Sequence, residues 1–227
     1  MPPGRLSTAR KVAAKRRPSP PPPPPVDQAG RARILAAAIR SFSEAGYDGT
    51  TTAAVAREAG VTQPLVHHHF GSKQGLWRAA MDELFAEVRV FTEPNPAPLA
   101  DRVLATAEQF VRFVAARPEV TRVIAREGAA PSPRLTYLVD RYLRAPFRIF
   151  VDAIRSGQRA GLIDPAVRGD LLLFFFLGAG SHLFDVTALA HESIGIDATS
   201  ARTREDFVVL VRELFRRGLF HNTRETT

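Results

Sequence analysis

The sequence contains no cysteine among its 227 residues. Disulfide bonds are therefore excluded, as are metal centres and nucleophiles that depend on cysteine. This absence is compatible with a reducing cytoplasm, where we expect the protein to reside. Hydrophobic residues make up 45% of the chain and charged residues 24%, which is typical of a globular protein. The length suits one or two domains that can bury a sizeable core.

The alternation of apolar and polar residues that marks β-strands is also missing, and no internal repeat is visible. The most apolar stretch is LLLFFFLGAGSHLF at positions 171–184. It contains His182, is followed by Asp185, and is shorter than the roughly 20 residues that a membrane span requires. We therefore expect a core helix here, no membrane partner, and an all-α fold.

Acidic residues are absent from the first 26 positions, which carry six Lys or Arg. Residues 27–80 carry six basic and four acidic residues, and residues 81–227 carry nineteen of each. All of the net charge of +8 thus lies toward the N-terminus. This partition predicts that a polyanion binds the N-terminal end and that residues 81–227 have another role.

Residues 1–26 are basic and then rich in proline. Such a segment buries too little apolar surface to fold, so the sequence predicts a disordered tail. No apolar stretch follows the charges, which argues against a secretory signal. Three interpretations stay open at this stage. The tail is passive, it is an artefact of a start codon placed too early, or it is a basic arm that contacts DNA.

The segment from Tyr47 to Leu76 has the pattern of two short helices joined by a tight turn. Thr51 suits the N-cap of the first helix, and Thr62 suits the N-cap of the second. Gly60 between them permits the left-handed backbone that stops a helix. Val66 is spaced to pack against the first helix. The pattern predicts a helix-turn-helix with Thr62 to His69 as the recognition helix.

At these residues the chain resembles the TetR family of bacterial transcriptional regulators. The similarity covers about residues 31–80. It rests on Arg33-Ile34-Leu35, Ala37-Ala38, Phe42, Gly46-Tyr47, Thr50-Thr51, Val55-Ala56, Ala59-Gly60-Val61-Thr62, His69-Phe70, Lys73 and Leu76. The resemblance implies a three-helix DNA-binding domain over residues 27–80. It also implies a helical ligand-binding and dimerisation domain over residues 81–227.

The resemblance also assigns roles in binding double-stranded operator DNA. Gln63 and Leu65 would read bases, and the carbons of Pro64 and Leu65 can pack on a thymine methyl group. His67 and His68 would contact phosphate or sugar. Phosphate would also be bound from two helix N-termini, by the side chains of Thr50, Thr51, Thr52, Thr62 and Lys73.

Further helices are expected along the rest of the chain. The first runs over about residues 27–45, and the fourth continues to about Phe91. Two more end near Arg117 and Glu127. A long helix over about 134–160 should kink at Pro146, and Asp164-Pro165 should open a helix that reaches about Ala190. A last amphipathic helix over about 203–220 presents Phe207, Leu210, Val211, Leu214 and Phe215 on one face.

In the TetR family the C-terminal domain binds a small molecule between helices, and its last two helices pair with a second copy. The resemblance therefore implies an effector and a homodimer. The candidates to line an effector pocket are Phe110, Phe113, Tyr137, Phe147, Phe150, Phe175 and His182, although such residues more often simply fill a core.

These observations together predict a repressor that a small molecule releases from a near-palindromic operator. One alternative is a dimeric DNA-binding protein without an effector. A second, an enzyme in the helical domain, lacks support because no nucleophile–base pair appears. Neither a cofactor nor a metal is expected. The run His67-His68-His69 cannot converge on one ion, because consecutive helical residues point about 100° apart; we expect His69 to be a hydrogen-bonded core residue.

Overall fold

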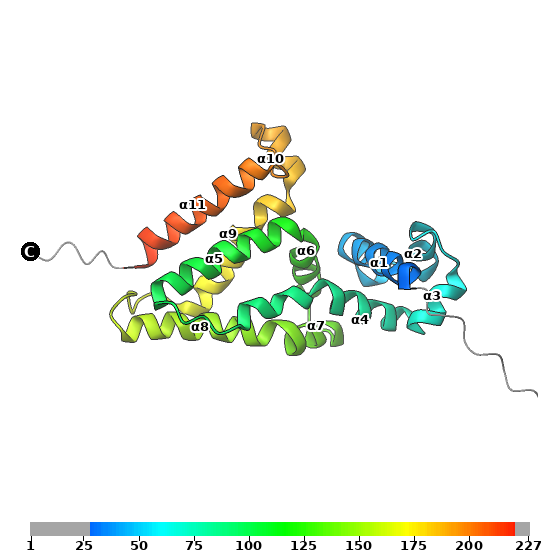
Figure 1. Cartoon of the computed structure of the whole chain (residues 1–227), viewed down its shortest axis with the longest axis horizontal. Helices are drawn as coiled ribbons and strands as arrows, with labels where there is room; N and C mark the ends of the chain where they lie inside the picture. Colours follow the sequence, from blue (N-terminus) through cyan, green and yellow to red (C-terminus); the bar gives the residue numbers. More distant parts are fainter. Residues whose placement is uncertain (1–27, 221–227) are drawn as a thin grey trace, which may run out of the picture.

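The computed structural model describes residues 28–220, so the predicted tail of residues 1–26 lies outside the described residues. Helices at one end of the molecule are α1 (Gln28–Gly49), α2 (Thr52–Glu58) and α3 (Gln63–Phe70). Helix α4 (Lys73–Leu84) begins among them and runs toward the other end, where the later helices gather (Figure 1). Within residues 28–220 the regular elements are helical, which confirms the all-α prediction.

Two helix boundaries in the N-terminal part are set by single residues. Gly46 sets the end of the straight part of α1, and Ser72 sets the start of α4. Gly46 has φ of 73° and interrupts α1 near its end. Arg126 packs so closely there that a Cβ atom on Gly46 would lie 2.8 Å from the Arg126 Cδ atom. Ser72 caps α4, since its hydroxyl accepts a hydrogen bond from the Gly75 amide at 3.0 Å. The positive φ and the close contact together explain why glycine ends the straight part of α1.

The fourth helix is shorter than the sequence predicted. Helix α4 ends at Leu84, and the 3₁₀-helix η1 (Ala86–Thr92) follows the buried Phe85. Phe85 and Val88, two of the apolar residues that suggested a continuous helix to Phe91, are nevertheless both buried. The 3₁₀ turns change the direction in which the segment presents its side chains.

The C-terminal part is built from α5 (Leu99–Ala116), α6 (Pro118–Glu127), α7 (Pro133–Leu138), the π-helix η2 (Val139–Leu143) and α8 (Arg144–Arg159). The kink expected at Pro146 is instead a π-helical turn that ends at Leu143. Proline at 146 has no amide to donate to the carbonyl of Tyr142, which lies in that turn. The helix therefore widens one turn before the proline.

Three helices complete the chain: α9 (Gly169–Asp185), α10 (Thr187–Ile194) and α11 (Ala201–Leu219). The prediction that Asp164-Pro165 opens a helix is wrong. The Asp164 carboxylate accepts a hydrogen bond from the Ala166 amide at 2.7 Å, which closes a local turn instead of capping a helix. The predicted end near Ala190 is also corrected, because α9 ends at Asp185 and α10 follows a sharp bend.

The length and hydropathy of the helices show whether any of them could span a membrane. Of the helices in the described residues, none is by itself long and apolar enough to cross a membrane. Taken together, α9 and α10 pass the test of length and composition, but they meet at a bend of 70°.

Two hydrophobic clusters fill the described part of the chain. The first joins α1, α2, α3 and α4 to Val120 and Val123 of α6 and to Leu138 of α7. The second lies between α5, α8, α9 and α11 around Phe176 and Phe184. The first cluster therefore extends beyond the predicted boundary at residue 80, because α6 and α7 share one core with α1, α2, α3 and α4.

Candidate nucleic-acid interface and ligand cavity

The turn between α2 and α3 has the geometry that the sequence predicted. Thr51 caps α2 by accepting a hydrogen bond from the Ala54 amide at 3.1 Å, and Gly60 has φ of 64°. Val55 and Val66 are fully buried against each other's helices. Thr62 occupies the N-cap position of α3, but its side chain makes no capping hydrogen bond there. Burial of Val55 and Val66 fixes which face of α3 points outward.

That outward face carries Gln63, Pro64, His67 and His68, all of which are exposed. Gln63 donates to the Thr52 hydroxyl at 3.3 Å, and its amide nitrogen lies 3.5 Å from His67 Nε2. His67 Nδ1 lies 3.3 Å from the Gly71 carbonyl oxygen. The neutral tautomer with its proton on Nδ1 satisfies both histidine contacts. The structure therefore brings Thr52, Gln63 and His67 together.

Three side chains near this face differ from expectation. Leu65 is half-buried and packs on the first cluster. Thr50 is buried, and its hydroxyl donates to the Gly46 carbonyl at 2.8 Å. This hydrogen bond does not support the predicted phosphate contact by the Thr50 side chain. His69 is half-buried, but its Nε2 has no hydrogen-bond partner within residues 28–220, so the prediction of a hydrogen-bonded core histidine is wrong for that atom.

Lys73 is the first residue of α4 and lies beside the recognition helix. Its Nζ atom lies over the ring of Tyr47, 4.4 Å from the ring centroid. This cation–π contact holds the ammonium group near the N-terminus of α4, where backbone amides also face outward. Both groups attract anions, so this corner suits a phosphate.

A network of charged and aromatic side chains joins this end of the molecule to α6 and α7. Arg134 of α7 lies over the same Tyr47 ring and donates to the buried Glu127 at 3.0 Å. Arg126 donates to the Glu44 carbonyl of α1 at 2.8 Å. These contacts tie α6 and α7 directly to α1, the helix that precedes the helix-turn-helix.

A second connection centres on Asp82 of α4. Its carboxylate accepts hydrogen bonds from Tyr142, from Tyr137 at 2.8 Å and from Arg141 at 3.0 Å. Burial raises the pKa of Asp82, but the tyrosine hydrogen bonds and the Arg141 charge outweigh it, and the net pKa is lowered. Burial is also the main reason that the pKa of Tyr142 is raised. Asp82 is therefore held as an anion that ties α4 to α7 and η2.

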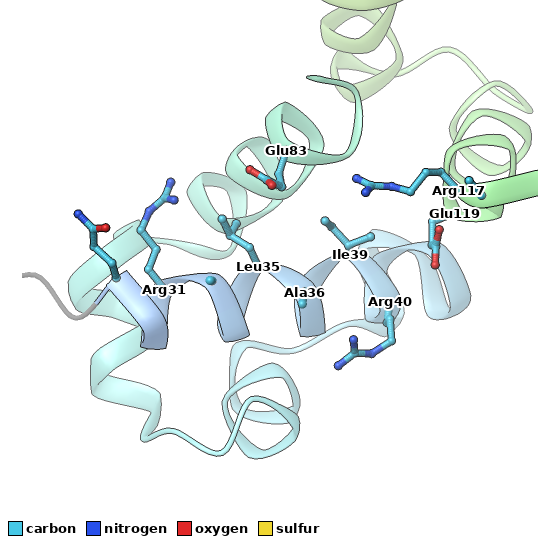
Figure 2. Close-up of a pocket in the computed structure, with 11 residues that line it drawn as sticks. Arg31, Leu35, Ala36, Ile39, Arg40, Glu83, Arg117 and Glu119 are labelled. Atoms are coloured by element: carbon cyan, nitrogen blue, oxygen red, sulfur yellow. The ribbon is translucent and has the colours of Figure 1, made fainter. Parts of the chain in front are cut away.

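A groove of about 760 Å³ separates α1 from α4 and the start of α6. Figure 2 shows Leu35 and Ile39 pointing into it from α1, with Glu83 and Arg117 facing them. Arg40, also at its edge, pairs with Glu58 at 2.7 Å. The lining mixes charges of both signs and includes no residue of α3.

A second cavity, of about 660 Å³, lies within the C-terminal helices. Four of the seven predicted lining residues are found in it: Phe110, Phe113, Phe147 and Phe150. The sequence missed Phe91 and Phe176, which also line it. Phe176 belongs to the same run as Phe175, and the periodicity of a helix apolar all round gave no sign of which one faces inward.

The other three predicted lining residues lie elsewhere. Tyr137 packs on Trp77, with ring centroids 5.6 Å apart, and bonds to Asp82. Phe175 is 68% exposed, and His182 is exposed as well. Their placement outside the cavity follows from the rotation of α9, which turns Leu173, Phe176 and Leu177 toward it.

Within residues 28–220, no group of three or more His, Asp or Glu residues is arranged to hold a metal ion. The exposed face of α3 and the neighbouring Lys73 offer hydrogen bonding and charge, and the cavity offers mainly apolar contact together with the charged side chains of Glu93, Arg102 and Asp152.

Comparison with known proteins decides the family. Residues 34–80 match the model of the bacterial regulatory proteins of the tetR family, and these residues form the helices described above. Over these residues the chain belongs to the TetR family. Its relatives are named as transcriptional regulators and not as enzymes. The family assignment thus rests on the segment that carries the helix-turn-helix.

Two curated TetR-type relatives show how far the sequence similarity extends. The HTH-type transcriptional repressor SCO4008 of Streptomyces coelicolor is 26% identical over 154 residues, covering 66% of this chain and 76% of that protein. The regulator BetI of Burkholderia thailandensis is 38% identical over 71 residues, covering 31% of this chain and 36% of its own length. The second match spans only about a third of BetI, so similarity is concentrated in one part.

Solved structures extend the fold comparison over most of the chain. The hemolysin II regulator HlyIIR matches with a TM-score of 0.63 at 18% identity, over 82% of this chain and 98% of that one. The ketosteroid regulator KstR2 of Mycobacterium tuberculosis matches with a TM-score of 0.62 at 22% identity, over 85% of this chain and 95% of its own. At these identities the likeness establishes the fold of this TetR-family chain.

Proposed function

We propose that this protein is a homodimeric repressor that binds a near-palindromic operator and leaves it when a small molecule occupies the C-terminal cavity. The exposed polar face of α3 carries this proposal, because Gln63, His67 and His68 are all accessible to a partner there. Residues 27–80 would read DNA, and residues 81–227 would bind the effector and form the dimer. A chromosomal operator implies that the protein works in the cytoplasm.

Base reading is assigned mainly to Gln63. Its amide nitrogen is used by Thr52 and His67, which leaves its carbonyl oxygen available as an acceptor. An acceptor in the major groove meets the amino group of adenine or cytosine. Pro64 offers carbons for a thymine methyl group, while Lys73, Thr51, Thr52, His67 and His68 would contact the backbone. Leu65 contributes less than the sequence suggested, because it is half-buried.

Dimer formation is assigned to the exposed apolar faces of α9 and α11. Phe174 and Phe175 of α9 are 67% and 68% exposed, and Leu214 of α11 is 62% exposed. Side chains of this size are rarely left in water in such a group unless another surface covers them. A two-fold pairing through these faces would place two copies of α3 about 34–36 Å apart, one turn of DNA.

The switch is assigned to α4 and η1. Lys73 begins α4, and the cavity wall includes Val88, Val90 and Phe91 of η1, which follows the same helix. A molecule in the cavity would favour one position of η1 and therefore of α4. A tenfold loss of operator affinity requires that it favour the released state by about 1.4 kcal/mol. The cavity is the observation that favours this mechanism over a dimer without an effector.

The test is protection of the DNA upstream of this protein's gene, followed by a screen for compounds that abolish the protection. Wild-type protein should protect a site of two half-sites, and Gln63→Ala should protect it only at higher protein concentration. Arg155→Ala serves as the control, because that exposed arginine lies in α8 and pairs only with Asp152. Equal protection by wild type and Gln63→Ala would contradict the assignment of α3 as the reading helix.

A further inference from the structure

The cavity of about 660 Å³ has an aromatic wall. Phe91 lies with its ring centroid 5.7 Å from that of Phe113, and Phe110 lies 4.8 Å from Phe176. The ring of Phe150 is stacked on Phe176 at 5.9 Å. The rings come from η1, α5, α8 and α9, so they enclose the space from several sides. An apolar body of drug size would fit such a wall.

Arg102 is the one cation among the described residues that line this cavity. It is half-buried, and its guanidinium has no hydrogen-bond or ion-pair partner within residues 28–220. Many other arginines of the C-terminal helices have acidic partners, such as Arg112 with Glu205 and Arg144 with Asp140. A half-buried guanidinium without such a partner is available to an anion.

The acidic residues of the cavity do not compete for that position. Asp152 is exposed and pairs with Arg155 at 3.2 Å. Glu93 is exposed in the segment that precedes α5. Solvent screens an exposed carboxylate more than it screens a half-buried guanidinium. An anion bound at Arg102 would therefore meet little repulsion from these two carboxylates.

We propose that the cavity takes an amphipathic organic anion, with its apolar body among the phenylalanines and its carboxylate or equivalent anionic group on Arg102. This inference rests on the proposed effector function and names the chemical class of the effector. Arg102 lies near the start of α5, and η1 forms the neighbouring wall. An occupant held at Arg102 would thus have its apolar part against the segment that continues α4.

The test uses two fluorescent probes of nearly the same shape on the full-length protein. One is 8-anilinonaphthalene-1-sulfonate, an anion, and the other is the uncharged N-phenyl-1-naphthylamine. Wild type should bind both probes. Arg102→Gln should weaken the anionic probe about tenfold or more, a difference of about 1.4 kcal/mol, and should change the uncharged probe less than about twofold.

Matched variants separate charge from folding. Arg102→Lys keeps the positive charge and should retain most of the affinity for the anion, whereas Glu93→Gln should leave it unchanged or stronger. Probe bound to the exposed faces of α9 and α11 would not depend on Arg102. The proposal is overturned if wild type binds neither probe, if Arg102→Gln weakens both equally, or if it weakens neither.

Operator affinity measured in the same samples separates this proposal from the one it rests on. If Arg102-dependent anion binding is found but no bound anion alters DNA affinity, the anion site is supported and the proposed release by an effector is contradicted. If the protein does not bind DNA at all, the proposed repressor function is contradicted. The preference of the cavity for an anionic over an uncharged probe is then decided by the probe titrations alone.

Discussion

Arg134 of α7 lies over the ring of Tyr47 at the end of α1, with its Cζ atom 4.4 Å from the ring centroid. The same arginine is the ion-pair partner of Glu127, whose side chain is 7% exposed. The Nζ atom of Lys73 also lies over this tyrosine ring, 4.4 Å from its centroid. One aromatic ring is thus contacted both by a cation of the C-terminal helices and by a proposed phosphate contact.

Loss of Arg134 should destabilise the protein markedly. Arg134→Gln leaves the buried Glu127 carboxylate without its partner and removes a cation–π contact, at a cost of about 2–4 kcal/mol. Urea unfolding measures the change. Arg155→Gln breaks an ion pair whose side chains are both well exposed and should cost less than about 1 kcal/mol. Equal losses in the two variants would mean that the Arg134 contacts carry no special weight.

Substitutions of Gln63 and Lys73 should weaken DNA binding in different ways. Gln63→Ala should cost about 1–3 kcal/mol on the cognate site and relax preference at one or two base positions. Lys73→Ala should weaken cognate and random DNA alike and lower the slope of log K against log salt by about 0.9. Anisotropy titrations at several salt concentrations distinguish them. A uniform loss in both variants would remove Gln63 as a base reader.

The exposed face of α11 should control assembly. Leu214→Glu places a charge where we expect an apolar interface, and light scattering at micromolar concentration should show a shift from dimer to monomer. Ala32→Glu adds the same charge on exposed α1 and should leave the dimer intact. A dimer that persists in Leu214→Glu at submicromolar concentration would place the interface elsewhere.

Asp82 should make stability sensitive to acid. Its pKa is lowered in the folded protein, so its stabilising effect is complete above the unfolded value of about 3.9 and is lost as pH falls through the folded value. Wild type should therefore lose stability between about pH 5 and pH 2 more steeply than Asp82→Asn. Urea unfolding across that range gives both curves. Parallel curves would show that the bonds from Tyr137, Arg141 and Tyr142 do not couple to Asp82 ionisation.

Local signals in the sequence were enough to predict the helix boundaries of the helix-turn-helix and the start of α4. Thr51, Gly60 and Ser72 act through their own backbone and side-chain preferences, and such preferences depend little on distant contacts. The end of α4 at Leu84 is different, because Phe85 is buried by Tyr142 of η2, 5.1 Å away between ring centroids. No local pattern reports a contact across 57 positions.

The same limit explains the errors in the ligand cavity. Phe175 and Phe176 are adjacent and chemically identical, yet one is exposed and the other is buried. Their different exposure depends on the rotation of α9 about its axis. The contacts of Phe176 with Phe110 and Phe215 fix that rotation. Arg102 was missed as well. Its place in the cavity wall depends on how η1, α5, α8 and α9 pack together, which no local pattern reports.

The central claim, that α3 of a dimer reads a two-part site, is tested most directly by selecting binders from a pool of random DNA duplexes. Full-length protein should enrich an inverted repeat whose half-sites lie about one helical turn apart. Gln63→Ala should enrich the same spacing with preference lost at one position in each half-site. A pool without enriched sequence after repeated rounds, or an identical site with both proteins, would contradict it.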